Sequence, residues 1–252
     1  MQVEVVSGAW ARSFFAGARV LVTGGTSGIG AGIARGFLEA GAEVTVTGVA
    51  AGEVAAARSD PVLNGADIRQ LDVRDGAALT ALVGGLAGLD AVVNCAGVIR
   101  RGDELDPEVF AMVLDVNLTG SMRVCAAARP LLAATGGAIV NLASMLSFFG
   151  GGLVPGYAAS KGGIVQMTKS LAIAYAADGI RVNAIAPGWI ETPLTAALRA
   201  DAARSDAILA RTALRRWGRP EDLVGGVLFL CSPAAGFVTG TVLPIDGGYA
   251  IT

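Results

Sequence analysis

Short apolar runs alternate along this chain with longer segments in which apolar residues recur every three to four positions. The short runs predict strands at residues 19–22, 44–47, 68–71, 91–93, 138–142, 181–185 and 241–245. The longer segments predict a helix that ends at residue 40 and further helices at 52–58, 76–86, 107–133, 157–177 and 221–231. Apolar strands separated by helices are typical of a parallel sheet that is covered on both faces. We therefore expect one α/β domain over residues 1–252, built on a doubly wound, seven-stranded parallel sheet.

The apolar composition raises the question of a membrane segment. Hydrophobic residues make up 53% of the chain, charged residues 16%, and the mean hydropathy is +0.60. Residues 130–160 and 223–245 contain no Asp, Glu, Lys or Arg, but prolines and glycines interrupt both stretches and would leave backbone groups unpaired in lipid. The first fifteen residues contain Glu4 and lack a basic start, so no signal peptide is expected. These features predict a cytoplasmic protein without a membrane span.

The chain contains no histidine, and this excludes several kinds of chemistry. A Ser-His-Asp triad, a Cys-His pair and an imidazole metal ligand are all impossible. Cys95, Cys125 and Cys231 are odd in number and far apart, so they indicate neither a disulfide framework nor a zinc site. We expect no metal, and any acid-base step must use another side chain.

A glycine-rich turn, Thr23-Gly-Gly-Thr-Ser-Gly-Ile-Gly30, connects the first predicted strand to the first predicted helix. At this place in a βαβ unit, the free N–H groups and partial positive charge of the helix N-terminus bind pyrophosphate. Gly24 permits the tight turn, Gly28 allows phosphates to approach the backbone, and Gly30 allows the helix to pack on the sheet. The turn predicts a Rossmann-like dinucleotide site, although its glycine spacing differs from the usual fingerprint.

Two further segments follow strands at the carboxyl edge of the predicted sheet, where open α/β folds bind ligands. Asp72 follows the third strand and Asn94-Cys-Ala-Gly97 follows the fourth, so we expect both to flank the adenosine half of a dinucleotide. Neither an acidic residue nor an arginine follows the second strand, at residues 48–49. Residues 36–57 contain no lysine or arginine, which leaves a 2′-phosphate without a local partner and favours NAD(H), with NADP(H) as the alternative.

Tyr157 and Lys161 stand four residues apart in a predicted helix, and therefore one turn apart on the same face. A tyrosine ionises near pH ~10, so a phenolate at neutral pH requires a pKa lower by about 2 to 3 units, which a fixed cation nearby helps to supply. Ser144 ends the preceding strand at the same edge of the sheet, and Asn117 lies in the helix before it. These four residues form the candidate catalytic set.

The order of these motifs resembles the signature of the short-chain dehydrogenase/reductase family over most of the chain. The matching elements are Thr23-Gly-x-x-x-Gly28-x-Gly30, Asn94-x-Ala96-Gly97, Asn117, Ser144, Tyr157-x-x-x-Lys161 and Pro187-Gly188. Cys95 departs from the pattern, since the family usually has a second Asn there. The resemblance implies an oxidoreductase in which Tyr157 is the general acid-base for hydride transfer between a nicotinamide cofactor and a secondary alcohol or ketone.

The same resemblance implies roles for the neighbours of Tyr157. Ser144 would hydrogen-bond the substrate oxygen, Lys161 would lower the pKa of Tyr157 and hold the nicotinamide ribose, and Asn117 would anchor a proton-relaying water. The residues expected to bind the cofactor are Thr23, Gly24, Thr26, Ser27, Gly28, Ile29, Gly30, Asp72, Val73, Asn94, Ala96, Gly97, Tyr157, Lys161, Pro187, Gly188, Ile190 and Thr192.

Residues 199–219 contain six arginines and two aspartates, a net charge of +4 in a chain whose total is −2, so the remainder carries −6. The segment follows the sixth predicted strand, where the family has its mobile substrate lid. A cationic lid on an acidic body indicates a negatively charged small-molecule substrate. Arg100 and Arg101 add two cations after the Asn-x-Ala-Gly motif. A solvated surface remains the alternative for each arginine.

Local segments at 96–101, 143–148, 198–205 and 216–218 resemble those of a bacterial group within the family. These are the 2-deoxy-D-gluconate 3-dehydrogenases and 2-dehydro-3-deoxy-D-gluconate 5-dehydrogenases, which act on sugar acids. We hypothesise that an arginine among Arg100, Arg101 and Arg204 binds the substrate carboxylate. Ser144 and Met145 complete the expected substrate site.

Other functions remain open on the sequence alone. Gluconate 5-dehydrogenase shares the arginine pair, a 3-oxoacyl-thioester (acyl carrier protein) reductase would use the same catalytic residues, and a non-catalytic dinucleotide-binding scaffold would use the same fold. Nucleic acid is not expected as a partner, because the chain is acidic overall. The apolar helix at 223–230 and the last strand resemble the surface through which the family forms tetramers, which predicts a homotetramer.

Overall fold

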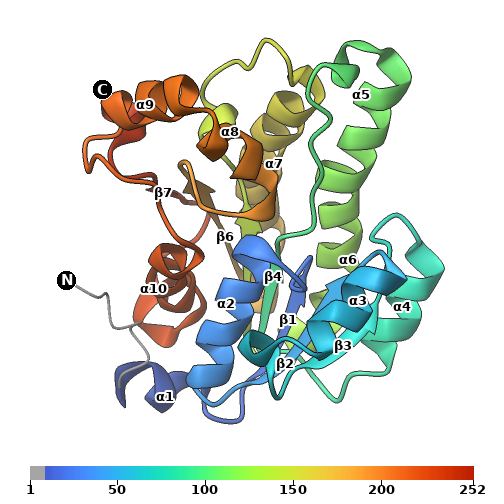
Figure 1. Ribbon diagram of the computed structural model, residues 1–252. Helices are drawn as coiled ribbons and strands as arrows, with labels where there is room; N and C mark the ends of the chain where they lie inside the picture. The colour runs from blue at the N-terminus through green and yellow to red at the C-terminus, as the bar shows by residue number, and fades with distance from the viewer. Residues whose placement is uncertain (1–8) are drawn as a thin grey trace.

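The structure is a three-layer arrangement in which helices cover both faces of one seven-stranded parallel sheet (Figure 1). The computed structural model describes residues 9–252. The strand order is β3-β2-β1-β4-β5-β6-β7, which confirms the expected fold class. The strands are β1 (Arg19–Thr23), β2 (Glu43–Gly48), β3 (Asp67–Gln70), β4 (Ala91–Asn94), β5 (Ala138–Leu142), β6 (Arg181–Pro187) and β7 (Val242–Ile245).

Two apolar cores lie on opposite faces of the sheet. The helices are α1 (Ala9–Phe15), α2 (Gly28–Glu39), α3 (Ala51–Arg58), α4 (Gly76–Gly84), α5 (Pro107–Leu114), α6 (Gly120–Ala133), α7 (Pro155–Ala174), α8 (Ala196–Ala200), α9 (Ala202–Arg211) and α10 (Pro220–Cys231). The core on one face includes residues of α2 and α10, which pack on each other, and the core on the other includes residues of α4, α6 and α7. Strands buried on both faces explain why most of them are apolar runs without alternation.

The chain reverses its direction of winding at β1, which lies between β2 and β4. Thr23 and Asn94 are register partners at the carboxyl ends of β1 and β4. A crevice outside the carboxyl ends of the strands at such a switch point is where doubly wound sheets bind their ligands. The fold therefore brings the glycine turn after β1 and the segment after β4 to one place.

The structure differs from the sequence prediction at several elements. The predicted helix at 107–133 is divided by a π-helical segment at Asp115–Thr119, and the short helices α1, α8 and α9 were not predicted. Strand β3 ends at Gln70 rather than at Leu71. Helix α7 begins at Pro155, two residues before Tyr157, because a proline at the first helical position gives up an N–H group that has no helical partner.

Among the described residues, Pro107–Ala133 is long and apolar enough to span a membrane by length and composition. Its α5 part packs against α7, and its α6 part packs against α4, β4 and β5. A helix that covers a sheet accounts for this composition. Glu4, part of the signal-peptide argument, lies outside the described residues.

Candidate active site

The glycine turn is built so tightly that two of its glycines have no room for a side chain. Gly24 has a φ of +63°, and a Cβ atom there would lie 2.7 Å from the backbone of Ala96. A Cβ atom on Gly30 would lie 2.2 Å from the carbonyl oxygen of Gly24. The turn is thus held against both the first turn of α2 and the segment that follows β4.

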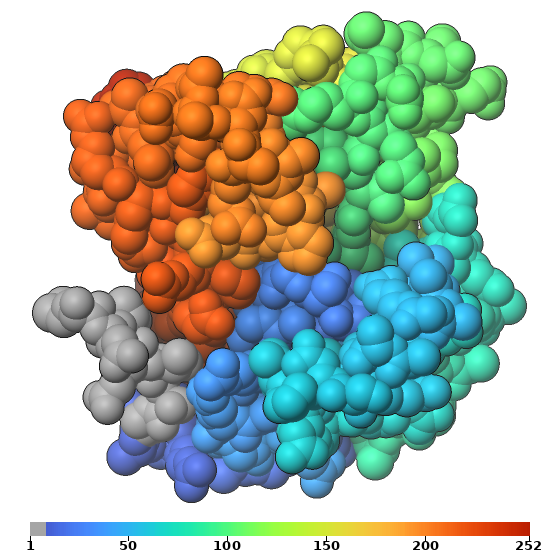
Figure 2. Space-filling model, in the orientation of Figure 1, coloured from blue at the N-terminus to red at the C-terminus, as the bar shows by residue number. Residues whose placement is uncertain are grey.

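The first turn of α2 is open to an anion. Ser27 precedes the helix in an extended conformation and makes no side-chain capping bond, and the first turn contains no acidic residue. The Cβ position of Gly28 lies 3.5 Å from the side chain of Thr192, in the segment after β6. In Figure 2 the orange surface of the chain after β6 borders the blue surface of the chain after β1. Free N–H groups at a helix N-terminus, faced by a hydroxyl-bearing loop, fit the pyrophosphate of a dinucleotide.

The segment after β6 reaches this turn from a fixed base. Pro187 ends β6, and the N–H group of Gly188 donates to the carbonyl oxygen of Ile245 at 3.0 Å. Ile190 is buried, and the N–H group of Thr192 donates to the hydroxyl of Thr195 at 3.1 Å. These contacts hold the segment over the crevice.

The side chain of Asn94 is engaged inside the protein. Its Nδ2 donates to Oδ1 of Asn141 at 2.8 Å, and Nδ2 of Asn141 donates to the hydroxyl of Thr168 at 2.9 Å. Thr23 contributes a weaker contact of 3.5 Å between its hydroxyl and Oδ1 of Asn94. Asn94 therefore connects β1, β4, β5 and α7, so its amide is not free to contact an adenosine.

Asp72 and Val73 also have partners within the chain. Arg74 donates to the carboxylate of Asp72, with Nη2 at 2.6 Å, and this bond lowers the pKa of that carboxyl group. Val73 is buried, and a Cβ atom on Gly120 would lie 2.6 Å from its side chain. Asp72 would have to share its carboxylate with Arg74 to contact a cofactor.

Glu53 was missed by the sequence analysis. The hydroxyl of Thr26, in the glycine turn, donates to Oε1 of Glu53, which lies on α3. A Cβ atom on Gly48 would lie 2.6 Å from that same hydroxyl, so no larger side chain fits at the end of β2. The sequence could have indicated Glu53, because it is an acidic residue about 20 positions beyond the glycine turn, the usual separation for a residue that binds the ribose.

Lys161 is buried and points into the candidate catalytic centre. Its Nζ donates to the carbonyl oxygen of Leu142 at 2.7 Å and lies 5.6 Å from the ring centroid of Tyr157. Burial lowers the pKa of this ammonium group to about 8, and Cys95 acts in the opposite direction. An ammonium with one protein acceptor has donor capacity left for a ligand.

Tyr157 lies in the first turn of α7, and opposing interactions act on its phenol. Burial raises the pKa of Tyr157, a hydrogen bond with Ser144 lowers it, and the charge of Glu104 raises it. Ser144 follows β5 and also accepts a hydrogen bond from the N–H group of Leu146 at 3.2 Å. The structure thus brings Ser144, Tyr157 and Lys161 together, as the sequence analysis expected.

Asn117 occupies the π-helical segment, a distortion that is frequent at functional sites. Its Oδ1 accepts from the N–H group of Val98 at 2.8 Å, and its Nδ2 donates to the carbonyl oxygen of Val98 and to the hydroxyl of Ser160. The Cβ position of Gly97 lies 3.3 Å from Oδ1 of Asn117 and 3.9 Å from Nζ of Lys161. All four candidate catalytic residues therefore lie around one point.

Several lid arginines have partners inside the protein. Arg211 stacks on Phe149 and Tyr249, and Arg216 pairs with Asp222 at 2.6 Å. Arg100, Arg101 and Arg204 are exposed and form no ion pair with any residue that the structure describes. The lid residues Arg215 and Arg219 share both properties. Met145 is buried at the start of the turn after Ser144.

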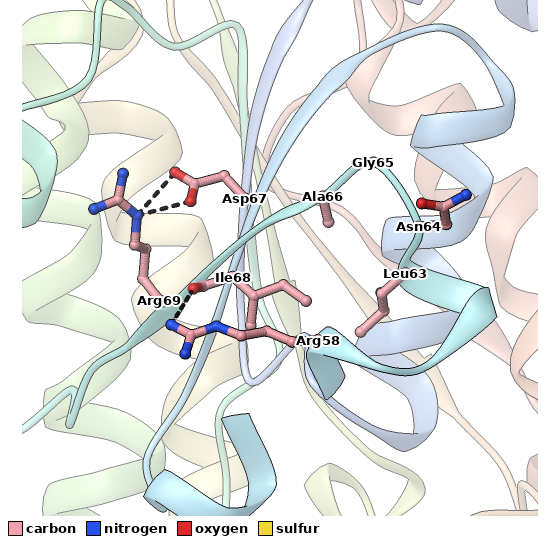
Figure 3. Close-up of a pocket in the computed structure, with 8 residues that line it drawn as sticks. All are labelled: Arg58, Leu63, Asn64, Gly65, Ala66, Asp67, Ile68 and Arg69. Carbon is pink, nitrogen blue, oxygen red and sulfur yellow. Dashed lines mark hydrogen bonds and ion pairs between the residues drawn. The ribbon is translucent and has the colours of Figure 1, made fainter. Parts of the chain in front are cut away.

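Two hollows on the surface are lined by residues other than the four candidate catalytic residues. A hollow of about 500 Å³ is lined by Arg58 and residues 63–69, on the edge strand β3 and the segment leading into it (Figure 3). Its arginines are already engaged, because Arg69 pairs with Asp67 and Arg58 donates to the carbonyl oxygen of Ile68. A smaller hollow of about 160 Å³, lined by residues that include Trp189 and Ile190, adjoins the segment after β6.

A doubly wound sheet with an anion site at its switch point and a Ser, Tyr and Lys cluster beside it defines a nicotinamide-dependent oxidoreductase. The chain belongs to the short-chain dehydrogenase/reductase family. A family model described as Enoyl-(Acyl carrier protein) reductase matches residues 24–250. The protein is therefore an enzyme of the class that acts on a CH–OH group with NAD or NADP.

Similar proteins carry more specific names. The chain is 41% identical to a 2-dehydro-3-deoxy-D-gluconate 5-dehydrogenase from Pseudoalteromonas atlantica, over 91% of this chain and 94% of the relative. It is also 41% identical to a cis-4-hydroxycyclohexanecarboxylate dehydrogenase from Sinomonas cyclohexanicum, over 93% and 97%. A gluconate 5-dehydrogenase from Burkholderia cenocepacia, solved in complex with NADP and tartrate, has a TM-score of 0.89 at 35% identity, over 97% and 100%.

Proposed function

We propose that this protein interconverts a secondary alcohol and a ketone on a small anionic sugar acid, of the 2-deoxygluconate or keto-deoxyuronate type, with NAD(H). One observation carries the proposal. The carboxylate of Glu104 accepts hydrogen bonds from the backbone N–H groups of Tyr157 and Arg100, both at 2.7 Å. A proton-transferring side chain and a cation-bearing loop therefore lie at the same rim of the sheet.

The contacts of the catalytic residues support the roles that we propose for them. A nicotinamide dinucleotide at the glycine turn supplies or accepts the hydride. Tyr157 gives a proton to the substrate oxygen in reduction and removes it in oxidation, and Ser144 stabilises the charge that develops there. Lys161 holds the ribose hydroxyls and opposes the effect of burial on the phenol. Asn117 anchors a water that relays protons to Lys161.

A carboxylate on the substrate would explain the free arginines. The relatives from Pseudoalteromonas and Sinomonas are both named for substrates that carry a carboxylate. Arg100, Arg101 and Arg204 are the candidates for binding it, since each is exposed. An arginine binds a carboxylate through two parallel hydrogen bonds, which fixes the orientation of the substrate as well as its position. Ser144 and Met145 would lie beside the reacting carbon.

The preference for NAD(H) rests on the charge around the end of β2. Residues 36–57 contain no lysine or arginine, and Glu53 lies beside Thr26 with no ion pair among the described residues. A carboxylate there accepts hydrogen bonds from ribose hydroxyls and repels a 2′-phosphate. The Burkholderia structure was solved with NADP, so a direct comparison of the two dinucleotides is the necessary test.

We also propose a single-domain subunit over residues 1–252 that forms a homotetramer in the cytoplasm. Large apolar side chains are exposed next to α10 and β7, where the sequence predicts the subunit contact. They include Phe229, which is 37% exposed, and Phe237 and Ile251, which are almost wholly exposed. Burying such side chains against further copies of the chain removes apolar surface from water.

Two enzymatic alternatives differ from the proposal in substrate alone. Gluconate 5-dehydrogenase activity would use the same arginines. A 3-oxoacyl-thioester reductase would use the lid arginines for the phosphate of an acyl carrier. The description of the family model also names an acyl carrier protein, but with an enoyl group rather than a 3-oxoacyl group. A non-catalytic scaffold has no use for a buried lysine beside a half-buried tyrosine at the dinucleotide crevice.

A substrate screen tests the proposal. The purified protein is assayed for oxidation of NADH and of NADPH with a 2-keto-3-deoxy sugar acid carrying a second keto group, with 5-ketogluconate and with an acetoacetyl thioester. We expect the highest kcat/KM with the deoxy acid and NADH. A higher kcat/KM with the thioester would replace the proposal with the reductase alternative. A higher kcat/KM with NADPH would overturn the cofactor preference alone.

A further inference from the structure

Glu104 is a buried carboxylate without a positive partner. It lies in the short turn Asp103–Leu105, its exposed fraction is 1%, and it forms no ion pair within residues 9–252. Its Oε1 accepts from the N–H group of Arg100 and its Oε2 from the N–H group of Tyr157. Burying a carboxylate is costly unless hydrogen bonds compensate it, so this arrangement needs both donors.

The carboxylate substitutes for a helix cap. Helix α7 follows Val154, whose side chain makes no capping bond, so the N–H groups of its first turn need other partners. Glu104 reaches this turn from a different segment and brings a negative charge to the positive end of a 20-residue helix. Glu104 thus meets the helix at the turn that carries Tyr157.

The two segments are packed closely enough to make this contact specific. A Cβ atom on Gly156 would lie 3.3 Å from Oε2 of Glu104 and 3.3 Å from the ring of Phe110. The N–H group of Gly102 donates to the carbonyl oxygen of Leu153 at 2.7 Å, which ties the same two segments a second time. The loop that carries Arg100 and the helix that carries Tyr157 therefore form one unit.

We propose that Glu104 is a positioning residue, which fixes the backbone of Tyr157 relative to that of Arg100 through its two hydrogen bonds. Its negative charge also acts on the phenol and favours the protonated form, which is the form that reduces a ketone. The inference rests on the proposed acid-base role of Tyr157. It adds that one carboxylate holds the proton donor, Tyr157, in a fixed position relative to the loop that carries Arg100. Glu104, from the turn Asp103–Leu105, and Lys161, one helical turn after Tyr157 on α7, then carry opposite charges on the two sides of Tyr157 along α7.

The charged surroundings agree with this assignment. The charge of Glu104 raises the pKa of Tyr157, in the same direction as burial, while the hydrogen bond with Ser144 lowers it. A phenol that keeps its proton to a higher pH remains a proton donor over a wider range. The other ionisable groups on the segments around Glu104, on α7 and on the elements packed against α7 include Cys95, Arg100, Arg101, Asp103, Asp106, Glu108, Asp115, Lys161, Lys169, Asp178 and Arg181.

The first test follows the titration of the phenol and needs no substrate. The chain has three tyrosines, so tyrosinate absorbance against pH, measured as the difference between each protein and its own Tyr157→Phe variant, isolates Tyr157. In Glu104→Gln the side-chain shape is kept and the charge is lost. We expect the titration to move to lower pH by about half a unit or more. The matched control, Glu108→Gln, changes an exposed carboxylate nearby and should leave the titration in place.

The second test uses Glu104→Asp, which keeps the charge but shortens the side chain, so that it no longer spans both N–H groups. We expect its titration to stay near that of the parent, while kcat/KM falls about tenfold through misplacement of Tyr157. In Glu104→Gln the alkaline limb of ketone reduction should also move to lower pH. An unchanged Tyr157 titration in Glu104→Gln overturns the inference. If that variant does not fold, a parental kcat/KM in Glu104→Asp overturns it.

These outcomes are separate from those of the substrate screen. A protein that fails to reduce any of the sugar acids still reports the Tyr157 titration, so the charge effect of Glu104 is measured even when the substrate assignment is wrong. Conversely, turnover of the deoxy acid with an unmoved titration in Glu104→Gln would keep the proposed function and remove Glu104 from it.

Discussion

The Cβ position of Gly30 lies 2.2 Å from the carbonyl oxygen of Gly24, well inside van der Waals contact. The first turn of α2 is therefore packed on the turn that precedes it, and the N–H groups that would bind phosphate are held in place by this contact. Gly30→Ala must push the helix away from the turn. We expect the free energy of unfolding to fall by about 1–3 kcal/mol and the dissociation constant for the dinucleotide to rise at least tenfold.

Gly76→Ala is the matched control, because Gly76 also begins a helix but has open space at its Cβ position. That variant should be as stable as the parent or slightly more stable. Fluorescence titration with NADH and urea unfolding measure the two quantities. Normal dinucleotide binding by Gly30→Ala would show that the glycine turn is not the phosphate site.

Removal of the phenolic hydroxyl of Tyr157 tests its role in proton transfer. We expect Tyr157→Phe to lower kcat by about 10²–10⁴-fold, the usual contribution of general acid-base catalysis, without weakening dinucleotide binding. Tyr175→Phe removes the same atom at the other end of α7, where the ring packs under Arg129. Steady-state kinetics of both variants are compared. A Tyr157→Phe enzyme as fast as Tyr175→Phe would exclude Tyr157 as the acid-base group.

Lys161 should make the stability of the protein depend on pH in a defined window. Burial lowers the pKa of its ammonium group from 10.5 to about 8 in the folded protein. Between these values the unfolded chain holds more of this proton than the folded one, so folding stability rises with pH there. Below about pH 8 the ammonium group is charged in both states, so the folded protein bears the full free-energy cost of burying that charge.

The measurement compares the parent with Lys161→Met by denaturant unfolding from pH 7 to 11. The free energy of unfolding of the parent, relative to the variant, should rise by up to about 3 kcal/mol across the window. The same variant should lose most of its activity, because the ribose contact and the cation beside Tyr157 are removed. A pH-independent difference in stability would mean that Lys161 titrates normally.

The sequence predicted the features that are encoded locally. The apolar strand runs were sufficient to predict the sheet, and the spacing of Tyr157 and Lys161 was sufficient to predict that they share one face of a helix, because each depends on the backbone geometry of one segment. Glu53 and Glu104 were not found, since each acquires its meaning from a contact with a distant segment, Thr26 and Tyr157 respectively. A buried glutamate is indistinguishable from a surface glutamate in a single sequence.

The lid, residues 199–219, also contains contacts between distant segments that could not be predicted from the sequence. Its positive charge was evident from the sequence, but the partners of Arg211 and Arg216 depend on where the fold places Tyr249, near the C-terminus, and Asp222, in the first turn of α10. The short helices α8 and α9 have five and ten residues, too few for a clear period. The structure therefore reduces six lid arginines to a smaller set of substrate candidates, of which Arg204 is one.

The last prediction concerns the substrate carboxylate and the arginines that remain free. An alanine substitution at the binding arginine removes a charge-assisted pair, so we expect KM for the sugar acid to rise about 10- to 100-fold with little change in kcat. Arg100→Ala, Arg101→Ala and Arg204→Ala are each measured. Arg215→Ala removes the same charge from the lid at a side chain that already donates to the carbonyl oxygen of Ala210, and should leave KM within about twofold of the parent.

The amide of the same sugar acid serves as a neutral substrate, whose KM should not respond to the substitution that raises KM for the acid. Unchanged KM values for the acid in all three variants, or equal increases for acid and amide, would remove these arginines from substrate recognition.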